Sequence, residues 1–414
     1  MKMNRRNVVK AGLAGASVLA MPYVARSAMG TVRIGLITPL SGGGELYGNY
    51  IKSGAEIAAE RLMKQGALGG AKIELVIRDD KGTPDGALTA FREITGDGVK
   101  LIAQGLFTSG LLATLPLLKE VDGTLVMVGP GSLPVTHEAF TPHAFRMGYT
   151  APTFGGGQGA LMAKKHPEAN KWAFIRTDLS SVEDISGYFR LRLKEEAEKA
   201  GRSVELMDEI LVPYKTADFR NQASQIAGSG ADALFTTIQG ADNITFYKQA
   251  RGFNLDQRIG LMCDSGNELA IARAMGKTTP KSLWSWTGWY PYADPDNTAS
   301  IEAVTMYKER TGEEYPSGFF GFAHDSILSL VDGLEKAGST DSAKMIPAIE
   351  SSTPTGCLGK ISYRPEDHTF AGLLTFIRFG ADESDPKGWK VFEVEHLNGA
   401  DYLEPPTPGK KFER

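Results

Sequence analysis

Two hydroxyl side chains stand where they could bind a ligand. Thr108 and Ser109 follow the apolar run Leu101–Gln104 and precede a segment that predicts a helix from about Leu111. Hydroxyls and free backbone amides at the start of a helix stabilise an anionic group such as a carboxylate. The same residue types also form ordinary helix N-caps, so both interpretations stay open.

Two further loops follow apolar runs in the same way. Ser132 comes after the run at 125–128, although the Gly-Pro-Gly turn before it would place a serine there without any ligand. Ser41 and Tyr47 lie past the first run of the chain. Tyr47 has an apolar ring with a polar tip, which suits either a binding wall or a surface position. If the runs are adjacent parallel strands, their carboxyl ends converge on one crevice.

The later part of the chain offers a carboxylate and two polar loops. Asp264 ends an apolar run and could pair with a cation in a dry cleft, or cap the helix that we expect from about Asn267. Ser181 follows another run, and Gln239 with Gly240 ends a third. These loops are the counterparts of the hydroxyl-bearing loops in the first part of the chain.

Tryptophan residues cluster after the last of these runs. Trp284 and Trp286 alternate along one predicted strand, so they share a face and at least one should be in the core. Trp289 and Tyr290 lie past that strand. An aromatic wall at this place would suit a larger apolar or aromatic ligand.

Motifs for catalysis, metals and cofactors fail in their details. The sequence has no GxSxG, and His137–Thr141 begins like HExxH but ends in threonine. None of the six histidines stands at metal-ligand spacing. The glycines of Gly155–Ala160 fit GxGxxA, but Pro152 separates them from the preceding strand, whereas a phosphate cradle needs a tight strand-to-helix turn. We therefore expect no catalytic residues, no metal and no cofactor.

Length and composition indicate an ordinary globular protein with two or three domains. The chain has 414 residues, a net charge of −4, 42% hydrophobic residues and 23% charged residues. This balance excludes disorder and gives no indication of nucleic-acid binding. Cys263 and Cys357, the only two cysteines, lie far apart, and whether they pair is left open.

The N-terminal residues are typical of an export signal. Adjacent Arg5 and Arg6 stand in a positive segment without acids, followed by the short apolar run Ala11–Met21 and the small residues of Ala25-Arg26-Ser27. The paired arginines indicate the twin-arginine route, and we expect a signal peptide over residues 1–27. A mitochondrial presequence or a buried N-terminal helix is the alternative. No later stretch is apolar enough to span a membrane.

Short β-branched runs alternate with amphipathic helical segments along the rest of the chain. Several runs, such as LVMV and ALFTT, are apolar throughout, which is typical of parallel strands buried on both faces. The pattern predicts an α/β fold of two Rossmann-like lobes with parallel-rich sheets. Breaks in the pattern predict three crossover segments between the lobes. We expect a first lobe from 28–148 and 290–358, a second lobe from 149–289 and 359–396, and a C-terminal tail over 397–414.

The order of these motifs resembles a known family. The opening RIGLITPLSGGGELYGNYIKSGAEIAAERLMKQG, the unit LVIRDDKGTPDGALTAFREI, the loops LIAQGLFTSG and VMVGPGS, and the unit KTADFRNQASQIAGSGADALF are similar to the branched-chain amino-acid-binding family. This is a type I periplasmic binding protein family of ABC importers. The resemblance covers about residues 31–395.

The resemblance implies roles for individual residues. Thr108 and Ser109 would contact the ligand carboxylate, with Ser132 and the backbone of Leu133 beside them, and Asp264 would hold an α-ammonium group. The family usually carries tyrosines near these two positions, where this sequence has Ser181 and Gln239–Gly240. The identity of the ligand's side-chain group therefore stays open. The ligand-binding residues that we expect are Ser41, Tyr47, Thr108, Ser109, Ser132, Leu133, Ser181, Gln239, Gly240, Asp264 and Trp289.

The resemblance also implies a function without catalysis. We expect a monomeric periplasmic protein that captures a small carboxylate-bearing ligand, closes its lobes over it and delivers it to ABC permease subunits. The ligand would be an amino acid of the branched-chain kind or another amino acid, or an aromatic acid. A ligand-sensing receptor on the same fold is the alternative.

Overall fold

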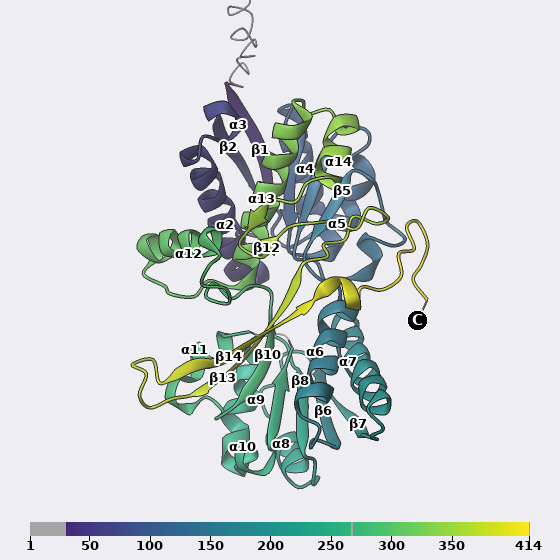
Figure 1. Ribbon diagram of the computed structural model, residues 1–414, viewed down its shortest axis with the longest axis vertical. Coiled ribbons are helices and arrows are strands. Elements are labelled where there is room, and N and C mark those ends of the chain that lie inside the picture. The colour runs from purple at the N-terminus through teal and green to yellow at the C-terminus, as the bar shows by residue number, and fades with distance from the viewer. Residues whose placement is uncertain (1–29, 266–267, 414) are drawn as a thin grey trace, which may run out of the picture.

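A computed structural model describes residues 30–265 and 268–413. The expected signal peptide and its arginine pair lie outside the described residues, as does Asn267. Figure 1 shows two lobes, one above the other, joined by strands and loops that cross between them. The predicted α/β class is confirmed: each lobe is a parallel-rich sheet flanked by helices.

The first lobe contains a five-stranded sheet in the order β2-β1-β3-β4-β5, and every pairing in it is parallel. Strands β3 and β4 lie inside the sheet and are buried at every residue, which explains why their sequences are apolar throughout. The strands are β1 Thr31–Thr38, β2 Lys72–Asp79, β3 Leu101–Gly105, β4 Thr124–Val128 and β5 Ala144–Met147.

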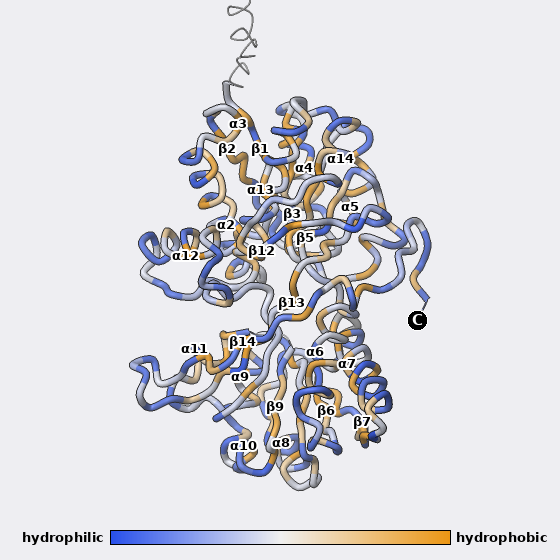
Figure 2. The backbone as a smooth tube through the Cα atoms, viewed as in Figure 1, coloured by the Kyte–Doolittle hydropathy of each residue, from blue (hydrophilic) through white to orange (hydrophobic). Residues whose placement is uncertain are grey.

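Helices from both ends of the sequence cover this sheet. The central helix α13 packs so closely on α2 that a Cβ added at Gly54 would collide with the backbone of Phe320. Hydrophobic side chains of strands and helices form the core. Figure 2 colours the backbone by the hydropathy of each residue. The helices are α2 Glu45–Lys64, α3 Ala67–Gly70, α4 Pro84–Gly96, α5 Thr108–Thr114, α12 Thr298–Thr311, α13 Gly318–Ala337 and α14 Ser342–Glu350.

The second lobe contains a seven-stranded sheet in the order β14-β13-β10-β9-β8-β6-β7. Its five strands from β10 to β7 are parallel, whereas β13 and β14 form an antiparallel hairpin that is added to β10. The strands are β6 Lys171–Thr177, β7 Glu205–Val212, β8 Ala233–Thr237, β9 Leu261–Asp264, β10 Leu283–Thr287, β13 Leu373–Ala381 and β14 Trp389–Asn398.

The glycines that imitate a dinucleotide motif lie inside a helix of this lobe. Gly155 and Gly159 let α6 and α7 approach closely, since a Cβ at Gly155 would lie 2.6 Å from the carbonyl oxygen of Ile185. They therefore serve helix packing and form no strand-to-helix turn. The helices are α6 Ala151–Lys165, α7 Ser180–Lys199, α8 Arg220–Ala227, α9 Ala241–Ala250, α10 Leu255–Arg258 and α11 Ala270–Met275.

Three segments connect the two sheets. They run from β5 to α6, from β10 to α12, and from α14 to β13; the last contains the short strands β11 Thr355–Gly356 and β12 Gly359–Lys360. The lobe boundaries given above stay a prediction. Several residues of the expected C-terminal tail are tied into the fold, because β14 continues to Asn398 and the buried Glu404 contacts His137 and Thr150.

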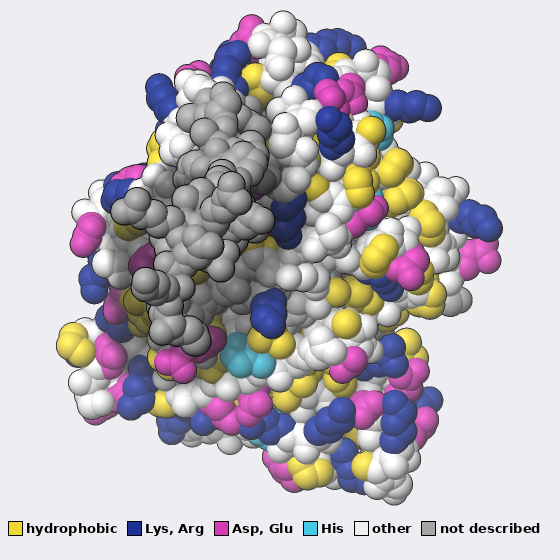
Figure 3. All heavy atoms as spheres, turned by 45° about the horizontal axis from the view of Figure 1, so that its top comes forward, with side chains coloured by type: hydrophobic (Ala, Val, Ile, Leu, Met, Phe, Trp, Pro, Cys, Tyr) yellow, Lys and Arg dark blue, Asp and Glu magenta, His cyan; other side chains and the backbone are white. Residues whose placement is uncertain are grey.

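The surface is mixed in charge on the face that Figure 3 displays, where Lys and Arg side chains are interspersed with Asp and Glu. Within the described part of the chain, no helix has both the length and the apolar character needed to cross a membrane.

A buried carboxyl at the end of β2 makes the first prediction. Burial raises the pKa of Asp80 to about 6, and the neighbouring Asp79 adds to the shift. The folded state therefore binds a proton more tightly than the unfolded state, so this group adds stability as the pH falls from about 7 to about 4. Asp80→Asn should raise the free energy of unfolding at pH 7.5 by up to about 3 kcal/mol.

Urea unfolding of the wild type and the Asp80→Asn variant at several pH values measures this effect. The amide can still accept the hydrogen bond from the backbone of Gly82, so the local turn is kept. The difference between the two proteins should vanish near pH 4. A difference that is independent of pH would contradict the assignment to Asp80.

Candidate functional site

The carboxyl ends of the strands of the two sheets meet between the lobes. Side chains from both sides approach there: Arg273 of α11 donates a hydrogen bond to the hydroxyl of Tyr50 in α2 at 3.3 Å. The charges of Glu268 and Tyr214, both in the second lobe, help to raise the pKa of Tyr47 in the first, after burial as the main cause. Tyr47 therefore lies close enough to the second lobe to be affected by its charges.

The predicted anion-binding residues lie on the first-lobe side. Thr108 and Ser109 form the first turn of α5, where Ser109 is exposed and Thr108 is partly buried. The N-cap position is Phe107, and no side chain caps this helix. The ordinary N-cap interpretation is therefore wrong for these two hydroxyls, and they stay accessible to a ligand.

Aromatic rings surround these loops. The ring of Phe319 lies 5.4 Å from that of Tyr47, in an edge-to-face arrangement. Gly129 has a φ of +70°, and a Cβ there would lie 2.6 Å from the Phe319 ring. Gly82 has a φ of +68°, and a Cβ there would lie 2.9 Å from the ring of Phe107. Tyr47 and Phe319 thus form an aromatic wall beside the loop after β4, whereas Phe107 packs against the loop after β2.

The loop after β4 is held from below by a buried arginine. Arg146 of β5 donates hydrogen bonds to the carbonyls of Pro130 at 2.6 Å and Ser132 at 2.5 Å, and to the hydroxyl of Thr136 at 2.9 Å. Burial lowers the pKa of Arg146 to about 10, so the guanidinium stays charged near neutral pH. Ser132 is partly exposed and Leu133 is buried at the start of a short 3-10 helix.

Ser41 is tied to the same lobe. Its hydroxyl donates to Asp79 at 2.6 Å, and the backbone amide of Leu40 donates to the same carboxylate at 2.8 Å. These bonds fix the loop after β1 against the end of β2. Ser41 itself remains exposed.

The predicted ligand-binding residues of the second lobe lie in a loop and in a helix. The backbone amide of Gln239 donates to Thr177 at 3.0 Å, and Gly240 has a φ of +62° where α9 begins, so both belong to the loop after β8. Ser181 lies in the first turn of α7, and its side chain is outside the described structure.

Asp264 is fully buried at the end of β9. Its carboxylate accepts a hydrogen bond from Asn243 of α9, and its backbone carbonyl accepts one from Gln158 of α6 at 3.0 Å. The helix that it was expected to cap begins at Ala270 with Leu269 at its N-cap. The structure thus brings the Asp264 carboxylate to α9, and its role towards an ammonium group stays a prediction.

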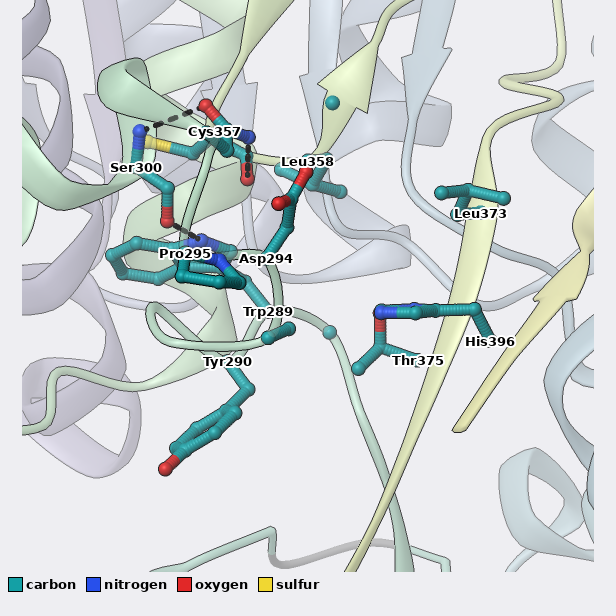
Figure 4. Close-up of a pocket in the computed structure, with 14 residues that line it drawn as sticks. Trp289, Tyr290, Asp294, Pro295, Ser300, Cys357, Leu358, Leu373, Thr375 and His396 are labelled. Atoms are coloured by element: carbon teal, nitrogen blue, oxygen red, sulfur yellow. Dashed lines mark hydrogen bonds between the residues drawn. The ribbon is translucent and has the colours of Figure 1, made fainter. Parts of the chain in front are cut away.

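Trp289 lies at the second crossing rather than beside the hydroxyl-bearing loops. Its indole nitrogen donates to Ser300 at 2.9 Å, and its ring stacks on that of Phe320. Figure 4 shows Trp289 at a pocket of about 270 Å³ between the second and third crossings and the β13–β14 hairpin. Trp284 is buried, which confirms the expected core tryptophan.

A buried cluster of His324, Asp325 and Cys357 has the residue types of a metal site. Two of its three side chains are already engaged: His324 contacts Arg61 through one ring nitrogen and Asp325 through the other, at 2.7 Å each. The carboxylate of Asp325 accepts the backbone amides of Cys357 and Leu358. A cationic guanidinium beside His324 opposes a metal ion, so the cluster instead anchors the third crossing. Both cysteines are free thiols.

Sequence reasoning missed Arg146, Glu268 and Arg273. A charged residue inside the apolar run AFRM was the available signal for Arg146. Glu268 and Arg273 lie near a predicted strand end, but nothing in their spacing indicates that they reach the other lobe.

Comparisons with known proteins agree with the two-lobed fold. The pattern of the family described as periplasmic binding protein matches residues 31–384. The leucine-, isoleucine-, valine-, threonine- and alanine-binding protein of Pseudomonas aeruginosa is 25% identical over 80% of this chain and 85% of its own length.

Solved structures show the same fold. The chain is similar to the closed leucine-, isoleucine-, valine-, threonine- and alanine-binding protein of Brucella ovis, with a TM-score of 0.78, 19% identity, and coverage of 93% of this chain and 99% of that one. A solute-binding protein of an ABC transporter from Rhodopseudomonas palustris, in complex with 3,4-dihydroxybenzoic acid, gives a TM-score of 0.73 and 23% identity, covering 89% and 98%. The chain belongs to the periplasmic binding protein family and has the two-lobed type I fold of ABC transporter substrate-binding proteins.

Proposed function

We propose that this protein captures a small carboxylate-bearing solute in the periplasm and delivers it, as a monomer, to the permease of an ABC importer. The observation that carries the proposal is a pair of hydroxyls, those of Thr108 and Ser109, that do not cap α5. The loop of Ser132 follows the adjacent strand, and the aromatic wall of Tyr47 and Phe319 lies beside that loop. Free hydroxyls and amides at strand ends suit a carboxylate.

The relatives support a carboxylate as the shared chemical group. The Pseudomonas protein is named for amino acids, and the Rhodopseudomonas protein holds a dihydroxybenzoic acid. An amino acid needs a carboxylate for its ammonium group, for which Asp264 is the candidate. An aromatic acid needs an apolar wall, for which Tyr47 and Phe319 are the candidates. The proposed function therefore includes both classes of ligand.

Binding would proceed without any covalent step. The carboxylate docks on Thr108, Ser109 and Ser132 of the first lobe. The second lobe then closes by bending of the three crossing segments and brings Gln239, Gly240 and the α7 N-terminal turn with Ser181 to the ligand. Closure removes water, which strengthens each polar contact, and shapes the two-lobed surface that a permease recognises.

A ligand screen tests the function directly. Thermal unfolding with L-leucine, other amino acids, benzoate and hydroxybenzoates should identify a compound that stabilises the protein. A ligand at 100 times its dissociation constant adds about 2.7 kcal/mol. Calorimetry should then give one site per chain with no product formed. Turnover of the bound compound would contradict the proposal.

The anion site is tested by removing its hydroxyls. Thr108→Ala combined with Ser109→Ala should weaken binding of the best ligand about tenfold or more, because hydrogen bonds to charged groups contribute about 1.5–3 kcal/mol each. The unliganded melting temperature should change little, since neither hydroxyl caps α5. Intact affinity in the double variant would contradict a carboxylate site there.

Asp264→Asn separates the two ligand classes. If an amino acid binds and Asp264 holds its ammonium group, affinity should fall by about 2–5 kcal/mol, the usual effect of removing one partner of a buried charge pair. An aromatic acid has no cation to lose, so its affinity should change little. Equal affinity of both proteins for a tightly bound amino acid would remove this role from Asp264.

A further inference from the structure

Glu268, just after β9 in the second lobe, contacts residues outside that lobe. Its carboxylate accepts hydrogen bonds from the backbone amide of Gly288 at 3.1 Å and of Gly318 at 3.0 Å. It also accepts one from the hydroxyl of Ser317 at 3.4 Å. Gly288 belongs to the second crossing, whereas Ser317 and Gly318 begin α13 of the first lobe. One carboxylate thus joins the second lobe to the crossing and to the first lobe.

The chain leaves space for this carboxylate. A Cβ at Gly318 would collide with Oε1 of Glu268 and would lie 2.9 Å from the Cα of Gly288. A Cβ at Gly288 would lie 2.7 Å from the ring of Phe322. The two glycines therefore allow α13 and the second crossing to pack together with the carboxylate between them.

Charge also favours the arrangement. Helix α13 has 20 residues, and a carboxylate at the N-terminus of a helix is stabilised by the free amides and the helix dipole. Arg273, five residues farther along, adds the contact with Tyr50 of α2 described above. Two neighbouring side chains of the second lobe thus reach two different helices of the first.

We propose that Glu268 is a latch between the lobes that sets how far they open when no ligand is bound. It is a positioning residue and need not touch the ligand. Without the carboxylate, the amides of Gly288 and Gly318 lose their shared acceptor, and the second lobe loses a direct connection to α13. Unliganded protein should then populate wider openings.

Distances between spin labels measure the opening directly. Cysteines that replace the exposed Lys64 of α2 and the exposed Lys248 of α9 carry the labels, because both native cysteines are buried. In the unliganded protein, Glu268→Ala should shift the distance distribution to longer values and broaden it. Glu268→Gln keeps an acceptor oxygen and should give an intermediate distribution. Glu309→Ala, an exposed carboxylate of α12, is the matched control and should leave the distribution unchanged.

Glu268→Asp provides a second test in case Glu268→Ala folds poorly. It keeps the charge but shortens the side chain by one methylene, so it cannot reach both amides and should shift the distribution in the same direction. Wild-type distributions in Glu268→Ala, or in both Glu268→Gln and Glu268→Asp, would overturn the latch. Because no ligand is added, this result is independent of whether the proposed carboxylate function is correct.

Discussion

Replacing Arg146 with methionine should lower the free energy of unfolding by about 3 kcal/mol or more and strongly weaken ligand binding. Three acceptors depend on this guanidinium: the carbonyls of Pro130 and Ser132 and the hydroxyl of Thr136. Methionine fills much of the space but donates nothing, so these buried groups lose their partner. An unsatisfied buried polar group costs about 1–3 kcal/mol.

Urea unfolding and calorimetry with the best ligand of the screen measure the two effects. Arg92→Met is the control, since Arg92 is exposed on α4. Arg146→Lys keeps the charge on a smaller donor group and should recover part of the stability but little of the affinity, because the geometry of the loop depends on all three bonds. Unchanged stability in Arg146→Met would show that the loop has another support.

Replacing Asp325 with asparagine should destabilise the protein by about 3–5 kcal/mol. The carboxylate accepts hydrogen bonds from His324 at 2.7 Å and from the backbone amides of Cys357 at 2.7 Å and Leu358 at 2.8 Å. Asparagine has one oxygen, and its NH₂ group would face a backbone donor. Since the side chain is fully buried, water cannot replace the lost acceptor.

The third crossing should also become more mobile when the Asp325 carboxylate is removed. Hydrogen exchange at the amides of Cys357 and Leu358 should therefore become faster in Asp325→Asn, and urea unfolding should occur at a lower concentration. Glu309→Gln on the exposed face of α12 controls for the removal of one charge. Protected amides in an otherwise destabilised variant would assign the stability to His324 instead.

The sequence predicted the elements better than their partners. Apolar runs of β-branched residues identified the strands, since burial on both faces leaves a continuous signal; the run at 125–128 is an example. The antiparallel pairing of β13 with β10 was not expected in detail, because β13 alternates in burial less clearly and its partner lies far away in the sequence. Pairing across a long connection leaves no local pattern to detect.

The sequence could predict a site residue only where its place after a strand determines its location at the edge of the sheet. Thr108 and Ser132 follow strands, so their loops were expected at the sheet edge. The direction of the Asp264 side chain depends on the face of β9 from which it projects, and Asn243 fixes it towards α9. Glu268 and Arg146 form hydrogen bonds with backbone groups of distant segments. Nearly every residue has such groups, so a sequence does not show which of them a side chain will bind.

The interleaved order of the two lobes has a consequence for folding. The first-lobe sheet needs residues 31–147, yet the helix α13 that packs on α2 begins only at Gly318. The second-lobe sheet starts at β6 and is completed by β14, which ends at Asn398. During synthesis, therefore, neither lobe can complete its core until most of the chain has emerged. Contacts of such large sequence separation slow folding, so the nascent chain should stay incompletely folded long enough for chaperones to engage it.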